Sequence, residues 1–585
     1  MEFKLINERS YDSALVQVLV NRGIKVDDMT HFLNTTDDDI NSYLQFGEEK
    51  LKKALAALLM AVREEKPCVV IVDSDADGYT SAAIIINYLY DLFPTWVESK
   101  LTWFIHEGKE HGLSDFKLKN DKPGLIICPD SSSNDYSQHK ELADNGWEVI
   151  VLDHHQAEKV SEYAIIINNQ LSDYKNKFLS GAGVTWQFCK YMDKMTENNY
   201  ADEYLDLVAL GLTADMMSMQ SFETKHLINK GFKTHNLKNP FVYGMAKHNR
   251  YSLGEGDITY MGAAFYIAPF VNAMVRSGTK PEKQLLFKSM LKFEAFEEVP
   301  STKRGHKAGD IEITYEQAIR VATNVKRRQT KSQDAGMELI EHLIEKNNML
   351  DNKVLLFLLD EGRLDKNIAG LIANKIMAKY NKPVCILMKG TIDNKPVYTG
   401  SARGCDKTDI RDFKGICEKC QGVVFAEGHP GAFGLCLEAD KTDIFLKDVN
   451  TLLEGVNEAV QYNVDLCYYN DDISADDVLS IGSHPELWGK DVDEPLIAIR
   501  NLKLTGNMVT VYEKKTNTVK IHLPSSNLDV MIFKASDEEC KKLQTDGFIE
   551  LNIVGKCATN EWQGFVKPQV IVEDYEIIDS NKYFF

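Results

Sequence analysis

Three aspartates stand at alternate positions directly after an apolar run. The stretch 71–83 reads IVDSDADGYTSAA, which places Asp73, Asp75 and Asp77 just before Gly78. Aspartate is depleted in strands, and burying its charge is costly unless that charge is compensated. Several carboxylates in one place repel one another until cations neutralise them, so this stretch indicates divalent-cation chemistry.

Acidic residues and histidines also end other apolar runs of the chain. Asp130 ends GLIICPD, Asp153 ends WEVIVLD, and Asp215 follows LVALGLTA. His154 and His155 come directly after Asp153. One such aspartate is usually a helix cap or a turn residue, and adjacent histidines usually have no ligand role. The ordered repetition of acidic strand ends is what favours a common site.

Oxygen ligands with one or two imidazoles suit Mn²⁺ or Mg²⁺ better than they suit metals that prefer thiolates. Two such ions about 4 Å apart can activate a water and stabilise the entering and leaving oxygens at phosphorus. The pattern DxDxDG also resembles part of a calcium loop, but the glutamate that completes such a loop is missing. The residues therefore predict a two-cation site for phosphoester chemistry.

Alternating strands and helices must position these side chains. The runs PCVVIVD, GLIICPD and WEVIVLD are typical of strands buried in a parallel sheet, and EYAIIINN adds a fourth candidate. In an open parallel sheet, ligands bind beyond the carboxyl ends of the strands, where the aspartates would converge. Residues 175–300 are expected to be mainly helical, and 301–310 to form a loop.

Three later segments extend this architecture. Residues 313–347 carry the pattern of one long helix, and KVLLFLLDE at 353–361 opens a second α/β unit. From about residue 495 short strands and turns indicate a small antiparallel barrel. The predicted fold class is α/β, with two α/β lobes joined by a long helix and a C-terminal OB-like β-barrel.

Composition and charge limit the class of protein. A chain with 44% hydrophobic and 26% charged residues is ordinary for globular domains. The net charge of −20 argues against non-specific coating of duplex DNA, although a local basic groove is compatible with it. The sequence shows no membrane-spanning run, no secretory signal at its start and an odd number of scattered cysteines, so we expect a cytoplasmic location.

One pair of cysteines has the spacing of metal ligands. Cys417 and Cys420 form a C-x-x-C pair, and Cys405 and His429 are the residues that would complete a set of four. No second C-x-x-C occurs, and ordinary thiols are the favoured interpretation. Metal binding by Cys405, Cys417 and Cys420 stays an open alternative.

The motifs together resemble those of the DHH phosphoesterase superfamily. VDSDADGYTS resembles its first motif, CPDSSS its second, LDHHQ its third and GLTADMM its fourth. EGHPGAFGL at 427–435 and GSARG at 400–404 resemble motifs of the DHH-associated domain. Within the superfamily, the RecJ-type single-strand-specific exonucleases are similar over nearly the whole chain, from LVNRGI near the start to the terminal barrel.

The resemblance implies a division of the chain into five parts. These are an N-terminal helical segment (1–50), a DHH phosphoesterase catalytic domain with a helical extension (51–310), a connecting helix (311–347), a DHH-associated domain (348–455), and an acidic linker with an OB-like nucleic-acid-binding barrel (456–585).

The resemblance also implies a reaction, which is stepwise 5′ to 3′ hydrolysis of single-stranded DNA to 5′-mononucleotides in recombination, repair or replication. It implies two divalent cations, Mn²⁺ first and Mg²⁺ as the alternative. By motif position the metal ligands would be Asp73, Asp75, Asp77, Asp130, His154, His155 and Asp215. The catalytic set would be Asp153, His154, His155 and His429, with Asp153 orienting a histidine.

A phosphodiester substrate needs further contacts. A guanidinium binds phosphate with two hydrogen bonds, and a histidine between glycines allows close approach of backbone N–H groups. The candidate substrate-binding residues are Arg403, Ser401, Gly428, His429, Arg276 and His106. An exposed arginine or a turn histidine without a ligand is the alternative for each. His106 stands where RecJ-type chains tend to have arginine.

Two other functions stay open. A different phosphodiesterase of the superfamily would act on short oligonucleotides, and a non-catalytic single-strand-DNA-binding replication scaffold would need no metal ligands. Expected partners are single-stranded DNA and a single-strand-binding protein or helicase, with no membrane and a monomeric chain. Trp562, Tyr512 and Phe533 are available in the barrel for base stacking, or equally for its core.

Overall fold

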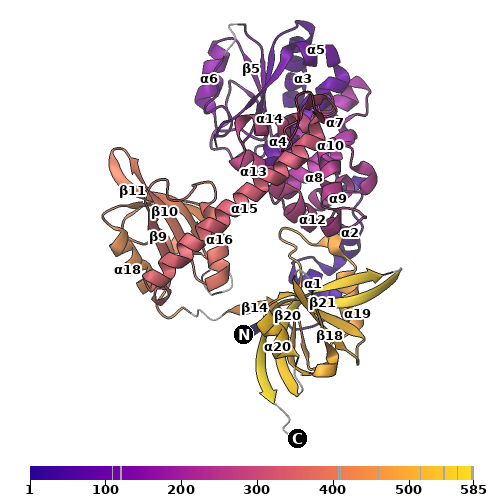
Figure 1. The fold of residues 1–585 in the computed structure, drawn as a ribbon. Helices are drawn as coiled ribbons and strands as arrows, with labels where there is room; N and C mark the ends of the chain where they lie inside the picture. Colours follow the sequence, from indigo (N-terminus) through magenta and orange to yellow (C-terminus); the bar gives the residue numbers. More distant parts are fainter. Residues whose placement is uncertain are drawn as a thin grey trace. The chain divides into compact units, whose positions relative to one another are not determined.

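Five parallel strands form the sheet that carries the acidic motifs. They are β2 (Cys68–Val72), β3 (Leu101–Ile105), β4 (Leu125–Pro129), β5 (Glu148–Asp153) and β6 (Ile165–Asn168), in the order β3-β2-β4-β5-β6. Strands β2, β4 and β5 are almost wholly buried, because helices cover the faces of a parallel sheet. The predicted alternation of strands and helices is confirmed (Figure 1).

The computed structural model describes residues 1–581 except 109, 119–121, 406, 407, 409, 411, 457–459, 514, 515, 545, 546 and 563. The chain divides into two units. The metal unit, as we call it, comprises Arg22–Arg327 and His484–Glu494. The second unit comprises Met1–Asn21, Arg328–Ser483 and Pro495–Phe585.

Four helices of the metal unit position its site. α4 (Ala76–Leu92) packs against α7 (Gly181–Thr196) and α8 (Leu205–Ala214), and α3 (Glu48–Arg63) packs against α7. Most residues of α4, α7 and α8 are buried, and the sequence of α8 is accordingly apolar at nearly every position. Both α4 and α7 begin at the edge of the sheet where its strands end, so their N-termini meet the strand-end aspartates.

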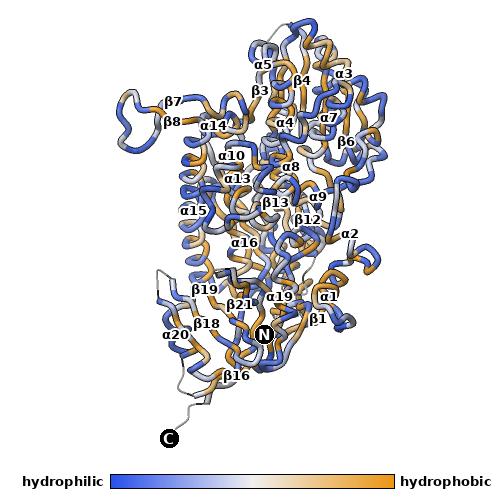
Figure 2. The backbone as a smooth tube through the Cα atoms, turned by 90° about the vertical axis from the view of Figure 1, so that its right-hand side faces the viewer, coloured by the Kyte–Doolittle hydropathy of each residue, from blue (hydrophilic) through white to orange (hydrophobic). Residues whose placement is uncertain are grey.

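The remainder of the metal unit is mainly helical, as expected. Helices α9 (Phe222–Gly231) to α14 (Lys280–Met290) lead to a two-stranded hairpin of β7 (Glu298–Pro300) and β8 (Ile311–Ile313). Helix α15 (Thr314–Lys346) follows, within the range predicted for the long helix. Figure 2 shows α15 as a continuous helix with the hairpin at its start.

The second unit contains a five-stranded mixed sheet in the order β12-β13-β11-β10-β9. β9 (Leu355–Leu359) and β10 (Val384–Ile392) are parallel and are connected through α16 (Ala369–Tyr380), as the second α/β unit requires. β11 (Lys395–Arg403), β13 (Ala432–Glu438) and β12 (Val423–His429) continue the sheet antiparallel.

The C-terminal strands form a seven-stranded sheet in the order β15-β16-β20-β21-β19-β18-β17. β16 (Leu496–Thr505), β20 (Phe548–Trp562) and β21 (Phe565–Asn581) are its long strands. Among the described residues the pairings run from β15 (Leu466–Tyr469) to β17 (Val509–Tyr512) and do not close a ring. The OB-like strand pattern is present, but the hydrogen-bonded sheet is open.

The first residues differ from the helical expectation for 1–50, whereas α1 (Ala14–Asn21) and α2 (Met29–Leu33) agree with it. β1 (Glu2–Leu5) pairs in parallel with β14 (Gln461–Val464), and the Met1 amino group forms an ion pair with Glu576 at 2.7 Å. Four residues are too few for periodicity to distinguish a strand from a helix, and the partner strand lies far away in sequence.

Two further observations concern the whole described chain. None of its described helices is both long and apolar enough to cross a membrane. All eleven cysteines are free thiols. No cysteine belongs to the metal-capable groups found among the described residues, so metal binding by Cys405, Cys417 and Cys420 gains no support.

Candidate metal centre

The turn after β2 holds the first two aspartates at the start of α4. Asp75 is the N-cap residue of α4 and accepts a hydrogen bond from the backbone N–H of Gly78 at 2.9 Å. Gly78 is required there, because a Cβ atom at this position would lie 2.5 Å from the Cβ of Asp73. The strand therefore ends in aspartates that cap a helix and crowd together at one edge of the sheet.

Asp77 lies in the first turn of α4 and faces the N-terminus of α7. Its carboxylate accepts hydrogen bonds from the N–H of Gly181 at 2.6 Å, the hydroxyl of Ser180 at 2.9 Å and the N–H of Ala182 at 3.1 Å. The unpaired N–H groups of a helix N-terminus favour a negative charge. Asp77 is thus fixed in orientation by three hydrogen bonds, although its side chain is buried and only 1% exposed.

Asp130 is the residue with the least compensated charge. It follows β4 in the left-handed region with φ of 65°, is 1% exposed, and neither carboxylate oxygen accepts a hydrogen bond from a described residue. Burial, together with the charges of Asp77 and Asp75, raises the pKa of Asp130 well above its usual range. A buried carboxylate without hydrogen-bond donors is costly, and a cation in contact with Asp130 would compensate its charge.

His154 points toward the same place. Its Nε2 atom has no hydrogen-bond partner among the described residues, yet it lies 3.2 Å from Oδ1 of Asp130 and 3.4 Å from Oδ2 of Asp215. Burial lowers the pKa of His154, so the imidazole is neutral at physiological pH, which is the form that binds metals.

Asp153 accepts hydrogen bonds from both His154 and His155. It accepts hydrogen bonds from the N–H of Ser133 at 3.0 Å, the N–H of His154 at 2.7 Å and Nδ1 of His155 at 2.8 Å. The hydrogen bond that His155 donates to Asp153 raises the pKa of His155 to about 9 despite partial burial. Burial alone would raise the pKa of Asp153, but the bond from His155 keeps it below the usual range. This geometry fixes the ring of His155 and leaves Nε2 as its ligand atom.

Asp215 completes the site from the end of α8. Its side chain is 32% exposed, which makes it the most open of the carboxylates facing His154. Burial, with the charges of Asp77 and Asp75, raises the pKa of Asp215 to about 8. Removing these charge repulsions requires protons or cations.

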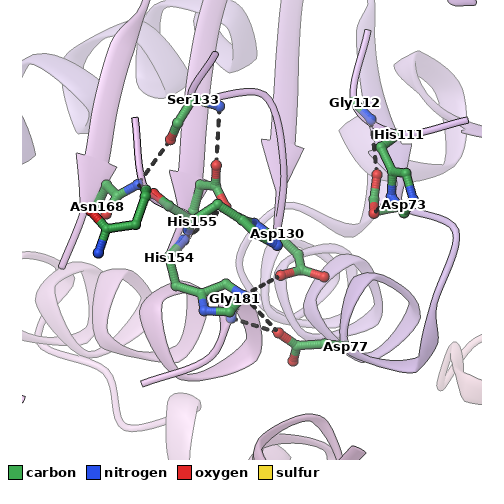
Figure 3. A network of polar contacts seen from close by, with 12 residues as sticks. Asp73, Asp77, His111, Gly112, Asp130, Ser133, His154, His155, Asn168 and Gly181 are labelled. Atoms are coloured by element: carbon green, nitrogen blue, oxygen red, sulfur yellow. Dashed lines mark hydrogen bonds and ion pairs between the residues drawn. The ribbon is translucent and has the colours of Figure 1, made fainter. Parts of the chain in front are cut away.

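Three overlapping groups of ligand atoms result, each with its atoms within 4.8 Å of one another. Figure 3 shows three of their members, Asp77, Asp130 and His154, turned toward one another. The groups are Asp130 with His154 and His155, Asp77 with His154 and Asp215, and Asp73 with Asp75 and Asp130. Every residue predicted as a metal ligand belongs to at least one group. Shared members suit two neighbouring cations, and mixed oxygen and imidazole donors fit Mn²⁺ or Mg²⁺.

His111, in the loop after β3, is a residue near the site that the sequence did not predict. His111 donates from Nδ1 to Asp73 at 2.6 Å, and the N–H of Gly112 donates to the same carboxylate at 2.8 Å. The hydrogen bond that His111 donates to Asp73 raises the pKa of His111. Its side chain is 63% exposed. No spacing rule distinguishes this histidine from others in a loop, so only the fold reveals it.

The prediction for His106 is corrected. Its side chain is fully buried, and Nδ1 lies 2.6 Å from Asp115, so His106 has no surface for a substrate in this structure. Arg276 is exposed in the last turn of α13 (Ala268–Ser277). It belongs to none of the ligand groups, and its substrate role stays a prediction.

Among the other predicted substrate residues, which all lie in the second unit, Ser401, Arg403 and His429 share one face of its sheet. Arg403 on β11 and His429 on β12 both pair with Ala432 on β13. Directly opposed residues of an antiparallel pair point to the same face, as do residues two apart, so Ser401 lies on that face as well. A Cβ atom on Gly370, near the start of α16, would lie 2.5 Å from Nη2 of Arg403. Gly428, which precedes His429, has a φ of 129°. The roles of these residues stay predictions.

Comparisons with known proteins agree with this geometry. The DHH family N-terminal domain matches residues 67–212, and the RecJ OB domain matches residues 464–574. The fold and the acidic-histidine site define a phosphoesterase of the DHH class.

The relatives narrow the class further. YorK from the SPbeta prophage of Bacillus subtilis, named as a single-strand DNA-specific exonuclease, is 33% identical over 100% of this chain and 99% of its own length. The chain therefore belongs to the RecJ family. Single-stranded-DNA-specific exonuclease RecJ of Bacillus subtilis is 25% identical over 98% of this chain and 69% of its own length.

Solved structures support the same fold. RecJ from Thermus thermophilus in complex with Mn²⁺ has a TM-score of 0.66 at 18% identity, covering 97% of this chain and 76% of that chain. The same protein in complex with Mg²⁺ has a TM-score of 0.64 at 16% identity, covering 100% of this chain and 79% of that chain.

Proposed function

We propose that the chain is a metal-dependent exonuclease that hydrolyses single-stranded DNA. The observation that carries this proposal is the pair of buried Asp130 oxygens that, like Nε2 of His154, have no hydrogen-bond partner among the described residues. Such atoms in one place need a cation. Membership of the RecJ family and the names of the relatives support the choice of substrate.

Two divalent cations, Mn²⁺ first and Mg²⁺ as the alternative, would be held by the three ligand groups. When bound, such ions activate water and neutralise charge on the phosphate oxygens. The chain positions the donors. Asp153 fixes the ring of His155, the N-terminus of α7 fixes Asp77, and the partial exposure of Asp215 keeps one side of the site open to a phosphate.

We propose 5′ to 3′ polarity with release of 5′-mononucleotides, so the 3′-oxygen of each released nucleotide is the leaving group. The face formed by Ser401, Arg403 and His429 supports a phosphate-binding role, because a guanidinium can hold a phosphate with two hydrogen bonds. Arg276 would add a further phosphate contact.

The setting of the enzyme is also proposed. Free thiols at all cysteine positions favour a reducing compartment, which supports the cytoplasm. We propose that the chain acts as a monomer on single strands supplied by a helicase or covered by a single-strand-binding protein during recombination, repair or replication.

Single strands labelled at the 5′ or the 3′ end, incubated with Mn²⁺, test activity and polarity together. The label at the 5′ end should appear at once as a mononucleotide, whereas strands labelled at the 3′ end should shorten gradually. Asp130→Asn should lower the rate by more than the roughly 10- to 100-fold typical of losing a residue behind the ligands. Asp144→Asn, at an exposed side chain in the last turn of α6 (Tyr136–Asp144), is the matched control. Equal rates for the two variants would refute the assignment.

A further inference from the structure

A hairpin with a basic tip projects from the metal unit, and the proposed mechanism does not use it. The hairpin arm comprises β7, β8 and the loop 301–310, and Figure 2 shows it extending away from α14 and the start of α15. Its tip carries Lys303, Arg304 and Lys307, all exposed, against one acidic residue, Asp310. In a chain of net charge −20, this is a local concentration of positive charge.

The base of the arm is firmly held. Glu312 is 5% exposed and accepts two hydrogen bonds from Arg320, at 2.9 Å from Nε and 2.7 Å from Nη2. It also accepts from Gln317 and Ser301, each at 3.0 Å. Lys303 lies 3.5 Å from this carboxylate, but the guanidinium already compensates its charge. A fixed base means that the tip loses little conformational entropy when it binds a partner.

Exposed aromatic rings lie beside the base of the arm. Phe296 is 64% exposed and meets the ring of Tyr315 edge-on, with centroids 5.5 Å apart. Tyr243 in α10 (Pro240–His248) is 51% exposed, and the next residue, Gly244, approaches Tyr315 so that an added Cβ would lie 3.4 Å from its ring. We call Tyr243, Phe296 and Tyr315 the aromatic patch. Large exposed rings in one place indicate a contact surface.

We propose that the hairpin arm and the aromatic patch bind single-stranded DNA outside the metal centre. The basic tip would contact phosphates, while the exposed rings of Phe296 and Tyr243 would stack on bases. Single-strand-binding surfaces combine these two features, because every base has a π-face and every nucleotide carries a phosphate. An acidic peptide would use the charges but not this set of rings. The choice of single-stranded DNA rests on the proposed function.

The charge contribution is tested by binding without turnover. In EDTA, fluorescence anisotropy measures the affinity of a labelled oligothymidylate of about 30 nucleotides at several salt concentrations. The triple variant Lys303→Gln, Arg304→Gln, Lys307→Gln should reduce the slope of log affinity against log salt by about 2, since each lost single-strand phosphate contact removes about 0.7. The control removes the same charge from α3 through Lys52→Gln, Lys53→Gln, Arg63→Gln. Equal slopes for both triple variants would overturn the proposal.

The stacking contribution is tested by Phe296→Ala. Affinity should fall about tenfold with an unchanged salt slope, because losing a stacked base removes no charge contact. Phe265→Ala is the matched control, since Phe265 is 63% exposed and Phe296 is 64% exposed. Thermal unfolding checks that each variant is folded. Affinity of Phe296→Ala equal to that of the control would contradict the stacking role.

Measurements of hydrolysis distinguish a failure of this inference from a failure of the proposed function. Hydrolysis of a dinucleotide should be unchanged in both arm variants, because that substrate is too short to reach a second surface. A wild-type chain that binds strands through the arm but hydrolyses none would refute the proposed function and leave this inference standing. Loss of affinity for an acidic peptide, with affinity for DNA retained, would overturn this inference alone.

Discussion

Gly181→Ala is the sharpest structural perturbation of the metal centre. Gly181 is the first residue of α7, and its N–H donates to Asp77. A methyl group there would lie 2.4 Å from both Cβ and Oδ1 of Asp130 and 2.6 Å from its Cα. Because the added methyl group overlaps the Cα atom of Asp130, rotation of the Asp130 side chain cannot relieve the clash.

The size of the effect follows from these distances. Carbon atoms in contact prefer about 3.5–4.0 Å, so Asp130 and the start of α7 must separate by about 1 Å. A displacement of that size at reacting groups costs about 100-fold in rate, or about 2.7 kcal/mol of transition-state stabilisation. Overpacking should also lower the free energy of unfolding by about 1–3 kcal/mol. Alanine elsewhere in a helix would stabilise it instead.

The assay is hydrolysis of labelled single strands with Mn²⁺, together with Mn²⁺ affinity by calorimetry. Gly256→Ala adds the same methyl group at a place with no atom within 4 Å, so it should behave as wild type. A folded Gly181→Ala variant with wild-type rate and Mn²⁺ affinity would refute the placement of Asp130 against α7.

Three further outcomes are expected. Mn²⁺ affinity should rise with pH up to about 9, because Asp215, with a pKa of about 8, and His155, with a pKa of about 9, must lose protons to bind the ion. Calorimetry that gives a pH-independent affinity would contradict this expectation. In EDTA, Asp153→Asn should lower the pKa of His155 from about 9 toward about 6.5, measured by NMR of labelled histidines, and an unchanged pKa would exclude the proposed support. The pKa of Glu312 is about 2, because the hydrogen bonds from Arg320 and Gln317 outweigh the effect of burial. The charge of Glu312 therefore stabilises the hairpin arm above about pH 4, and this stabilisation decreases as the pH falls toward 2. Glu312→Gln should therefore reduce hydrogen-exchange protection of the hairpin arm by about 2–3 kcal/mol at neutral pH, with a difference that shrinks in acid, and equal protection at neutral pH would refute the anchoring.

The strand-end aspartates were predictable for a general reason. Parallel strands end at one edge of their sheet, so apolar runs that close with Asp130 or Asp153 bring those residues together without any knowledge of loops. The long helix was predictable because its apolar period continues for many turns.

Other features depend on contacts between residues far apart in sequence. The hydrogen bonds between Asp77 and the start of α7 join positions more than 100 residues apart. The same holds for β1, whose partner strand begins at Gln461. His111 and His106 stand in one loop, and only the folded chain shows that the first meets Asp73 while the second is buried.

The most direct test of the cation site is anomalous diffraction at the manganese edge from crystals grown with Mn²⁺. The account expects density for cations in contact with Asp130 and His154, shared with Asp77, Asp215 or Asp75. Active protein whose bound manganese lies only away from these residues would contradict the central claim.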